Sequence, residues 1–272
     1  MKFKSIFYFS LMSVFLISAT GYSAPKYSTD GKRIIRVATS NVEHEKTLLA
    51  AKEEFEKSGY KLEIKVFNDY TAPNMAVVEG SMDANYFQHE PFLKLFNHSK
   101  GTNLECGRPL YLITTGIFSN KIKSMKELKD GAKVAIFNDN SNRDFALRFL
   151  QHLGLIKLKK GLKIATKLDI VENKRNLKFI EMDGFNIVNM MDEVDIAVMA
   201  ASHMAQAGKN PKSGIAYYND AKGDDVRALV LTVRNGDMKT DWAKALEKAL
   251  MSIKAQKVVE ETSKGARIPA FK

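Results

Sequence analysis

Apolar and polar positions recur with two periods along this chain, and these periods predict strands and helices in turn. Residues 33–38 are rich in β-branched side chains, and residues 61–67 alternate apolar and charged side chains as a strand does. Between them, the apolar residues of 43–57 recur at helical spacing, and Gly59 follows the expected helix end. The order strand, helix, strand predicts a parallel pair joined by a right-handed crossover.

Polar residues follow both of these predicted strands. Residues 39–41 read Thr-Ser-Asn, and residues 68–70 read Asn-Asp-Tyr. Ligands in open parallel sheets bind outside the carboxyl ends of the strands. We therefore expect the two segments to lie on one rim of the sheet.

The same pattern starts again in the second half of the chain. Residues 132–137 predict a strand, residues 138–142 form a polar loop with good N-cap residues, and a helix follows over 143–153 until Gly154. Other strands are expected at 82–86, 110–118, 177–182, 194–199 and 227–233. The repeated module predicts an α/β protein of two lobes, each with a mixed, mostly parallel sheet flanked by helices.

The first residues differ in kind from the rest. Lys2 and Lys4 precede an apolar run over 6–17, and small residues follow, which predicts a cleavable signal peptide over 1–24 and a polar tether over 25–32. The only cysteine in the sequence is Cys106, so we expect no disulfide and no lipid-accepting cysteine after the signal. The expectation is a soluble, unanchored periplasmic protein in which Cys106 is a buried apolar residue.

Composition and motifs exclude several classes of function. The formal net charge is +11, but the lysines are scattered and no aromatic-basic motif of nucleic-acid modules is present, so we expect no nucleic-acid partner. The sequence lacks a Walker loop, HExxH, GxSxG and paired Cys/His ligands. We therefore expect neither an enzyme nor a bound cofactor or metal.

Residues 67–92 combine polar groups and aromatic rings more densely than any other segment. The polar residues are Asn68, Asp69, Asn74, Asn85, Gln88 and His89, and the aromatic ones are Tyr70, Tyr86, Phe87 and Phe92. A small-molecule pocket needs this mixture of apolar lining and a few placed polar groups. The alternative reading makes the rings core residues and the amides turn formers.

This segment resembles the signature of the NlpA/MetQ family, the methionine-binding lipoproteins of ABC importers. FNDY-x-x-PN begins at Phe67, DAN-x-FQH-x-P begins at Asp83, and further matches follow over roughly 34–271. The resemblance implies a type II solute-binding fold whose ligand cleft lies between lobe 1 (33–115 and 225–272) and lobe 2 (116–224) and closes by hinge motion. It also implies a monomer that delivers its ligand to an inner-membrane permease with its ATPase.

The resemblance fails at the positions that hold the ligand's polar groups. The family's carboxylate-binding arginine falls on Phe145, with Arg143 two residues earlier. A family asparagine falls on Ala200, a tyrosine on His203, and another asparagine is missing beside Arg227. The candidate ligand-binding residues are Asn68, Tyr70, Tyr86, Phe87, His89, Asn138, Asn142, Arg143, Phe145, Ala200, His203 and Arg227.

These departures shape the expected function. Losing a bidentate arginine should cost a buried carboxylate on the order of 2–5 kcal/mol. The sequence therefore predicts a receptor for methionine or a closely related amino-acid-like ligand, such as a modified methionine or a short peptide. The alternative is a surface or adhesive protein on the same fold whose cleft has lost transport function.

Overall fold

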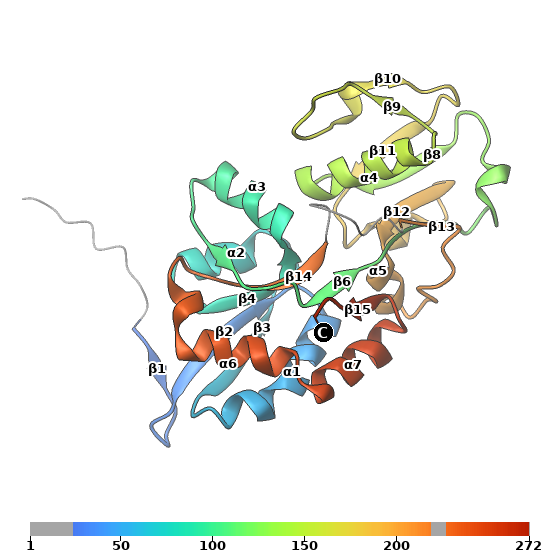
Figure 1. Ribbon diagram of the computed structural model, residues 1–272. Helices are drawn as coiled ribbons and strands as arrows, with labels where there is room; N and C mark the ends of the chain where they lie inside the picture. The colour runs from blue at the N-terminus through green and yellow to red at the C-terminus, as the bar shows by residue number, and fades with distance from the viewer. Residues whose placement is uncertain (1–23, 219–226, 272) are drawn as a thin grey trace, which may run out of the picture.

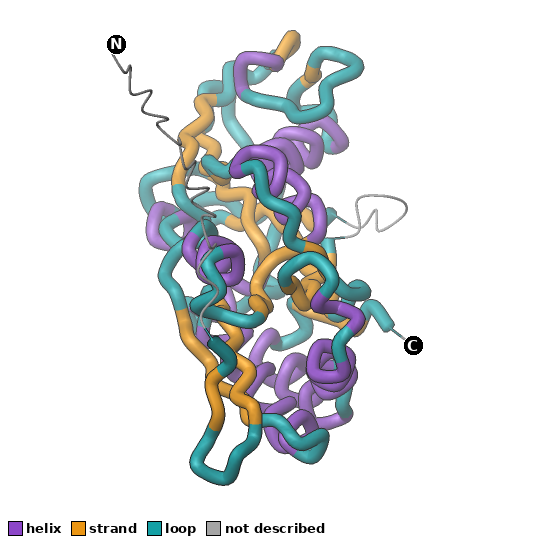
Figure 2. The backbone as a smooth tube through the Cα atoms, turned by 90° about the vertical axis from the view of Figure 1, so that its left-hand side faces the viewer, coloured by secondary structure: helices purple, strands orange, loops and turns teal. Residues whose placement is uncertain are grey.

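The computed structural model describes residues 24–218 and 227–271, in which two sheets form the centres of two lobes (Figure 1). Among these residues, eight strands build the sheet of lobe 1: β1 Lys26–Tyr27, β2 Arg33–Thr39, β3 Lys61–Val66, β4 Ala84–His89, β5 Glu105–Cys106, β6 Tyr111–Ile113, β14 Ala228–Val233 and β15 Arg267–Pro269. Five build the sheet of lobe 2: β7 Thr115–Phe118, β8 Lys133–Phe137, β11 Lys178–Met182, β12 Ile196–Ala200 and β13 Ala216–Tyr217. Viewed from the side, the molecule is longer than it is wide (Figure 2).

Lobe 1 buries both faces of its sheet. β2 pairs in parallel with β3 and β4, and β14 runs antiparallel to β4 and β6. Neighbouring residues of β2 point to opposite faces: Val37 packs in the core that includes Leu48 and Trp242, whereas Ala38 packs with Val77 and Phe96. The helices of lobe 1 are α1 Val42–Glu56, α2 Ala72–Val78, α3 Glu90–Lys100, α6 Asp241–Leu250 and α7 Ile253–Ser263.

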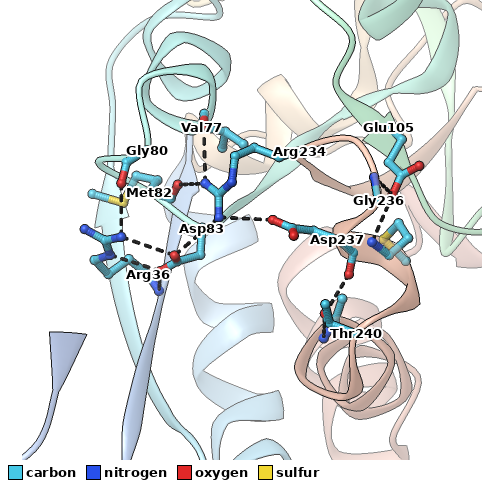
Figure 3. Close-up of polar contacts among 12 residues, drawn as sticks. Arg36, Val77, Gly80, Met82, Asp83, Glu105, Arg234, Gly236, Asp237 and Thr240 are labelled. Atoms are coloured by element: carbon cyan, nitrogen blue, oxygen red, sulfur yellow. Dashed lines mark hydrogen bonds and ion pairs between the residues drawn. The ribbon is translucent and has the colours of Figure 1, made fainter. Parts of the chain in front are cut away.

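A buried ion-pair network fixes three segments of lobe 1 (Figure 3). Asp83 accepts hydrogen bonds from the backbone N–H of Arg36 at 2.8 Å and from its Nε at 3.0 Å. Arg234, at the end of β14, places Nη2 3.6 Å from Asp83 and 3.0 Å from Asp237. The network joins β2, the turn before β4 and the segment after β14.

Lobe 2 has a mostly parallel sheet in the order β11-β8-β12-β7-β13. β8 pairs in parallel with β11 and β12, and β7 is antiparallel to β12. Helix α4 (Asn140–His152) covers one face through Leu147 and Leu150, and α5 (Ala201–Gln206) follows β12 directly. The short elements are a hairpin of β9 Lys157–Leu158 and β10 Ile170–Glu172 and the 3₁₀ turns η1 Met125–Glu127, η2 Lys167–Asp169, η3 Ile187–Met190 and η4 Asp237–Lys239.

The predicted strand over 110–118 is in fact two strands in different sheets. β6 ends at Ile113 in lobe 1 and β7 begins at Thr115 in lobe 2, so the chain changes lobes at Thr114. The Thr114 N–H donates to Ala266 at 3.2 Å, and its carbonyl accepts from Ala201 at 2.8 Å. A continuous apolar run cannot reveal this change, because both halves are buried strands.

Other sequence predictions need smaller corrections. The strand expected over 82–86 is β4, which extends to His89, and part of the expected tether is the edge strand β1. Leu49 belongs to the apolar pattern of the helix expected over 43–57 but is 51% exposed, and Cys106, expected to be buried, is only half-buried. The signal peptide, except Ala24, and the lobe boundary at 224–225 lie outside the described residues. Within the described ranges no helix has the length and apolar character needed to span a membrane.

Candidate functional site

A cavity lies between the two lobes and is lined by residues from both. Its lining residues in lobe 1 include residues at the start of α1 and in β4, β6, β14 and β15. Those in lobe 2 include residues in β7, β8, α4 and α5. The lining residues are Asn41, His44, Tyr70, Phe87, Gln88, His89, Phe92, Ile113, Thr115, Phe137, Asn142, Phe145, Ala146, Ala200, Ser202, His203, Arg227, Leu229 and Arg267. Apolar walls with a few buried polar groups are typical of a small-molecule site.

An aromatic wall forms one side of this cavity. Tyr70 lies parallel to Phe87 with ring centroids 6.2 Å apart and edge-on to Phe92 at 6.1 Å. Phe185, from lobe 2, packs on the same Tyr70 ring at 4.6 Å. Gly184 allows this approach, because a Cβ there would lie 2.9 Å from the Tyr70 hydroxyl oxygen.

Tyr70 also makes a polar contact between the lobes. Its hydroxyl lies 3.1 Å from Nε2 of His203, which is in α5. Burial lowers the pKa of His203 to about 4, so the ring is neutral at neutral pH and can take part in a neutral hydrogen bond. The aromatic wall is therefore held partly by a contact that depends on the closed arrangement of the lobes.

The opposite side of the cavity holds a hydrogen-bond network between Arg227, His89 and Asn142. Asn142 Nδ2 donates to Asp139 Oδ2 at 2.9 Å, which orients its Oδ1 toward lobe 1. That oxygen lies 3.1 Å from His89 Nε2 and accepts from Arg227 Nη1 at 3.1 Å. Arg227 Nη2 donates to the carbonyl of Ser141 at 3.1 Å. Helix α4 of lobe 2 is thus bonded to β4 and to the residue before β14 in lobe 1.

The tautomer of His89 follows from its position at the start of α3. Its Nδ1 accepts from the backbone N–H of Phe92 at 3.2 Å, so the ring proton lies on Nε2 and is donated to Asn142. Burial and the neighbouring Arg227 lower the pKa of His89 to about 3. His89 Nε2 and Arg227 Nη1 lie 3.0 Å apart as two donors that share one acceptor, Asn142 Oδ1, and because the His89 ring is neutral this is not a contact between two cations.

Phe145 covers the face of the Arg227 guanidinium. The guanidinium carbon lies 4.0 Å from the centroid of the Phe145 ring, which is a cation–π contact. Phe145 is 6% exposed and Arg227 is 9% exposed, so little water screens this contact. The arginine and the ring come from different lobes, and they fill one end of the cavity together.

At the base of the cavity lie residues of α1 and β15 from lobe 1. Asn41 caps α1, accepting from the His44 N–H at 2.8 Å, and its Nδ2 lies 3.4 Å from His44 Nε2. Burial, with Arg267 and His203 nearby, lowers the pKa of His44 well below its usual range. Arg267 of β15 is 2% exposed and forms an ion pair with Glu43 at 3.3 Å.

The structure brings together eight of the twelve residues singled out in the sequence. Tyr70, Phe87, His89, Asn142, Phe145, Ala200, His203 and Arg227 line the cavity. Asn68 and Asn138 are exposed elsewhere, and Tyr86 is buried behind the lining, with its ring edge-on to His44 at 5.7 Å. Arg143 turns away: it donates to Asn140 at 2.7 Å and lies 3.7 Å from Glu181.

Several amides of the signature segment hold lobe 1 together. Asn74 Oδ1 accepts from Asn85 at 2.8 Å and from Gln88 at 2.6 Å, and Gln88 also donates to Thr232 at 3.2 Å. These bonds join α2, β4 and β14. The alternative reading of these amides as turn formers is therefore wrong for Asn74 and Asn85, which lie within α2 and β4 and bond these elements together.

The set of candidates taken from the sequence did not include Arg267, His44, Thr115 or Ser202, although all four line the cavity. Arg267 lies 40 positions after Arg227, the candidate nearest to it in the sequence, and follows the last helix, so spacing alone gives no link to the others. An arginine between Ala266 and Ile268, in an otherwise apolar stretch, is the one signal that could have found it. No group of three or more His, Cys, Asp or Glu side chains within 24–218 and 227–271 is placed to hold a metal ion.

Comparison with known proteins gives one consistent family. The model of the family described as NlpA lipoprotein matches residues 35–271. A curated relative from Haemophilus influenzae, named probable D-methionine-binding lipoprotein MetQ, is 33% identical and aligns over 97% of this chain and 96% of its own.

Solved structures agree with the sequence comparison. A nutrient-binding protein from Burkholderia cenocepacia bound to methionine superposes with a TM-score of 0.82 at 34% identity, covering 87% of this chain and all of that chain. A periplasmic substrate-binding protein of an ABC transporter from Coxiella burnetii gives 0.80 at 31%, with the same coverage. These matches confirm the predicted two-lobed fold with a cleft between the lobes.

One prediction from the sequence is corrected by these relatives. The protein was expected to be soluble and unanchored, because the only cysteine in the sequence, Cys106, lies far beyond the expected signal peptide. The matching family model and the Haemophilus relative are both described as lipoproteins, so the expectation of an unanchored protein is wrong. The periplasmic location agrees with the Coxiella protein, which is described as periplasmic.

Three observations support one family assignment: the cavity between the lobes, the fold and the extent of the matches. The family model covers nearly all of the chain outside its first 34 residues. The curated relative and the two solved structures named above exceed 30% identity over most of their lengths. This chain belongs to the NlpA lipoprotein family of substrate-binding proteins.

Proposed function

We propose that this protein is the periplasmic receptor of an ABC importer and binds methionine or a closely related amino-acid-like ligand in the cavity between its lobes. The observation that carries the proposal is the composition of that cavity: an aromatic wall around Tyr70 and Phe87 faces buried polar groups from both lobes. The aromatic wall suits an apolar side chain, and the buried polar groups suit a charged head. The relative from Haemophilus carries a methionine-binding name, and the Burkholderia structure holds methionine.

The proposed ligand-binding residues are the eight earlier candidates that line the cavity. Tyr70, Phe87 and Phe145 supply apolar surface, and His89, Asn142, His203 and Arg227 supply polar groups across the lobe boundary. Ala200, where the family has an amide-bearing residue, leaves that wall without a hydrogen-bonding side chain. The loss of the family's amide and arginine favours a ligand whose head differs from that of free methionine.

The proposed mode of binding and delivery follows from the two-lobed architecture. Lobe 1 (33–113 and 225–272) and lobe 2 (115–224), with the crossing at Thr114 instead of after residue 115, close around the ligand, and the closed form is presented to a membrane permease with its ATPase. Contacts between the lobes, such as Tyr70 with His203, support this proposal because they exist only when the lobes are together. The protein itself needs no chemistry beyond binding.

Calorimetric titration with L-methionine, D-methionine and methionyl dipeptides tests the proposal, together with native mass spectrometry of the purified protein. We expect at least one of these ligands to bind and to raise the melting temperature, since binding only to the folded state stabilises it by mass action. Micromolar or tighter binding of free L-methionine would remove the reason to expect a different head group. A protein that is empty and ignores the whole panel would contradict the proposed receptor function.

A further inference from the structure

A buried arginine at the base of the cavity has donors that the protein does not use. Arg267 lines the cavity and is 2% exposed. Its Nη2 lies 3.3 Å from Glu43 Oε2 and 3.4 Å from Thr262 Oγ1. Among the residues that the structure describes, its Nε and Nη1 have no hydrogen-bond partner. Buried donors are normally paired, so these N–H groups indicate an acceptor that comes from outside the protein.

Glu43 does not satisfy this arginine by itself. The ion pair is close in distance, but neither carboxylate oxygen of Glu43 makes a hydrogen bond of good geometry within the described part of the chain. Burial raises the pKa of the Glu43 carboxyl, which disfavours its negative form. The base of the cavity therefore carries a cation with an incomplete counter-charge.

Neighbouring groups at the base are also left with unused capacity. Asn41 Nδ2 donates toward His44 Nε2, which places the ring proton on Nδ1, and this Nδ1 has no partner in residues 24–218 and 227–271. The hydroxyl of Tyr86, behind the lining, has none there either. Arg267, His44 and Tyr86 are all buried, lie close together and have unused hydrogen-bonding groups. Such a cluster indicates a binding subsite, whereas one unpaired group could be a local irregularity.

The other arginine of the cavity is in a different state. Arg227 uses Nη1 and Nη2 for Asn142 and Ser141, and Phe145 covers its face. These bonds connect the two lobes. Arg227 therefore links the two lobes. Arg267, in contrast, still has N–H groups that can donate hydrogen bonds to a ligand.

The end of α7 places Arg267 at this point. The helix ends at Ser263, and Lys264 and Gly265 adopt positive φ angles of 48° and 82°, which reverse the chain. β15 then pairs with β6, with Arg267 opposite Ile113, another residue of the lining. The guanidinium is held on a paired strand, so little ordering is needed when a ligand arrives.

We propose that Arg267 is the anion anchor of this cavity and donates its unused N–H groups to the carboxylate of a small ligand whose apolar part lies toward the aromatic wall. The inference rests on the proposed function for the ligand class, and it assigns the carboxylate to lobe 1 instead of to α4 of lobe 2. Charge-assisted hydrogen bonds to a buried carboxylate are strong enough to decide specificity. A ligand of the same shape without the negative charge should therefore bind much more weakly.

The test compares a paired variant with a matched control. Arg267→Met/Glu43→Gln removes both charges, so no unpaired ion remains buried. Lys254→Met/Glu53→Gln removes an exposed ion pair, 2.9 Å long, that joins α7 to α1 on the surface. Both variants remove one cation and one carboxylate from lobe 1, and in both the carboxylate comes from α1.

The first readout uses simple probes that do not depend on the natural ligand. We expect butyrate at constant ionic strength to raise the melting temperature of the wild type and the control, and butyramide to have little effect. The Arg267→Met/Glu43→Gln variant should not respond to butyrate. Without ligand, this variant should be at least as stable as the control; a much lower melting temperature would make the pair structural and overturn the proposal.

The second readout separates this proposal from the receptor function. We expect L-methionine to bind the wild type roughly 10- to 100-fold more tightly than the Arg267→Met/Glu43→Gln variant, while L-methioninol distinguishes them little. Equal methionine binding by both would overturn the anchor and leave the receptor function standing. A wild type that responds to butyrate but to no methionine derivative would keep the anchor and contradict the receptor proposal. A wild type that responds to neither probe would overturn both.

Discussion

The guanidinium carbon of Arg227 lies 4.0 Å from the ring centroid of Phe145, although the two residues belong to different lobes. By resemblance, Phe145 occupies the position of the family's carboxylate-binding arginine. The structure therefore places a cation in nearly the same region but delivers it from the opposite lobe.

This relationship predicts a non-additive response to exchanging the two residues. Phe145→Arg alone should weaken ligand binding, because a second guanidinium about 4 Å from Arg227 would be repelled by about 4 kcal/mol at the effective dielectric of a protein surface. Phe145→Arg/Arg227→Asn removes that repulsion and should recover much of the loss. Calorimetric titration of both variants measures the coupling.

The control for this exchange is Arg108→Asn, which alters an arginine whose side chain is 62% exposed. It should leave binding unchanged. If the double variant binds no better than Phe145→Arg, the proximity of the two positions has no energetic consequence for the ligand.

Tyr70→Phe should loosen the closed arrangement of the lobes. The substitution keeps the ring against Phe87 and Phe185 but removes the hydroxyl 3.1 Å from His203 Nε2. Ligand affinity should fall by about 0.5–1.5 kcal/mol, the net value of a typical hydrogen bond. Calorimetry gives the affinity, and small-angle scattering without ligand should show a more open average shape. Tyr27→Phe, at a residue that is 63% exposed, is the control, and a Tyr70 variant with unchanged affinity would show that this bond does not couple to binding.

Stability should fall between about pH 6.5 and pH 4 because of the buried histidines. Burial lowers the folded-state pKa of His89 to about 3 and that of His203 to about 4, while the unfolded values stay near 6.5. Below pH 6.5 the unfolded chain binds more protons, so the stabilisation is complete above 6.5 and is lost as pH falls toward the folded pKa values. Each histidine contributes a slope of at most about 1.4 kcal/mol per pH unit.

Urea denaturation at several pH values measures that slope. His89→Gln should flatten it, since glutamine does not take up a proton in this range. His98→Gln, at an exposed position of α3, should leave the profile as it is. A wild type whose stability is constant from pH 7 to pH 4 would contradict the assignment of neutral, buried rings.

Asp83→Asn should destabilise lobe 1 strongly. Asp83 is 4% exposed and is the shared partner of Arg36 and Arg234 (Figure 3), so its loss leaves the buried Arg36 without its carboxylate, while Arg234 keeps Asp237 at 3.0 Å. Breaking a buried pair from one side costs about 3–5 kcal/mol. Glu90→Gln, which breaks an exposed pair with Lys94, should cost no more than about 1 kcal/mol. Urea denaturation compares the two, and similar midpoints would refute a supporting role for the network.

Much of the fold could be predicted from local pattern. The strand and helix periods of residues 33–67 and 132–153 correspond to β2, α1, β3, β8 and α4 with ends shifted by few residues. The single strand predicted over 110–118 is the exception, because the chain changes lobes at Thr114, inside one apolar run. Which sheet a buried strand joins depends on its partners, and those are distant in the sequence.

The candidate site, too, could be predicted only in part from the sequence. Residue types and their spacing were enough to indicate which residues could be chemically useful and to identify the family from the signature segment, because both are properties of the chain alone. The folded arrangement was needed to show that Arg143 turns away, that Arg227 reaches Phe145 and that Arg267 enters the cavity. A cavity between two lobes is made by residues brought together from both, so the membership of the site depends on the packing and direction of each side chain, which local sequence does not encode.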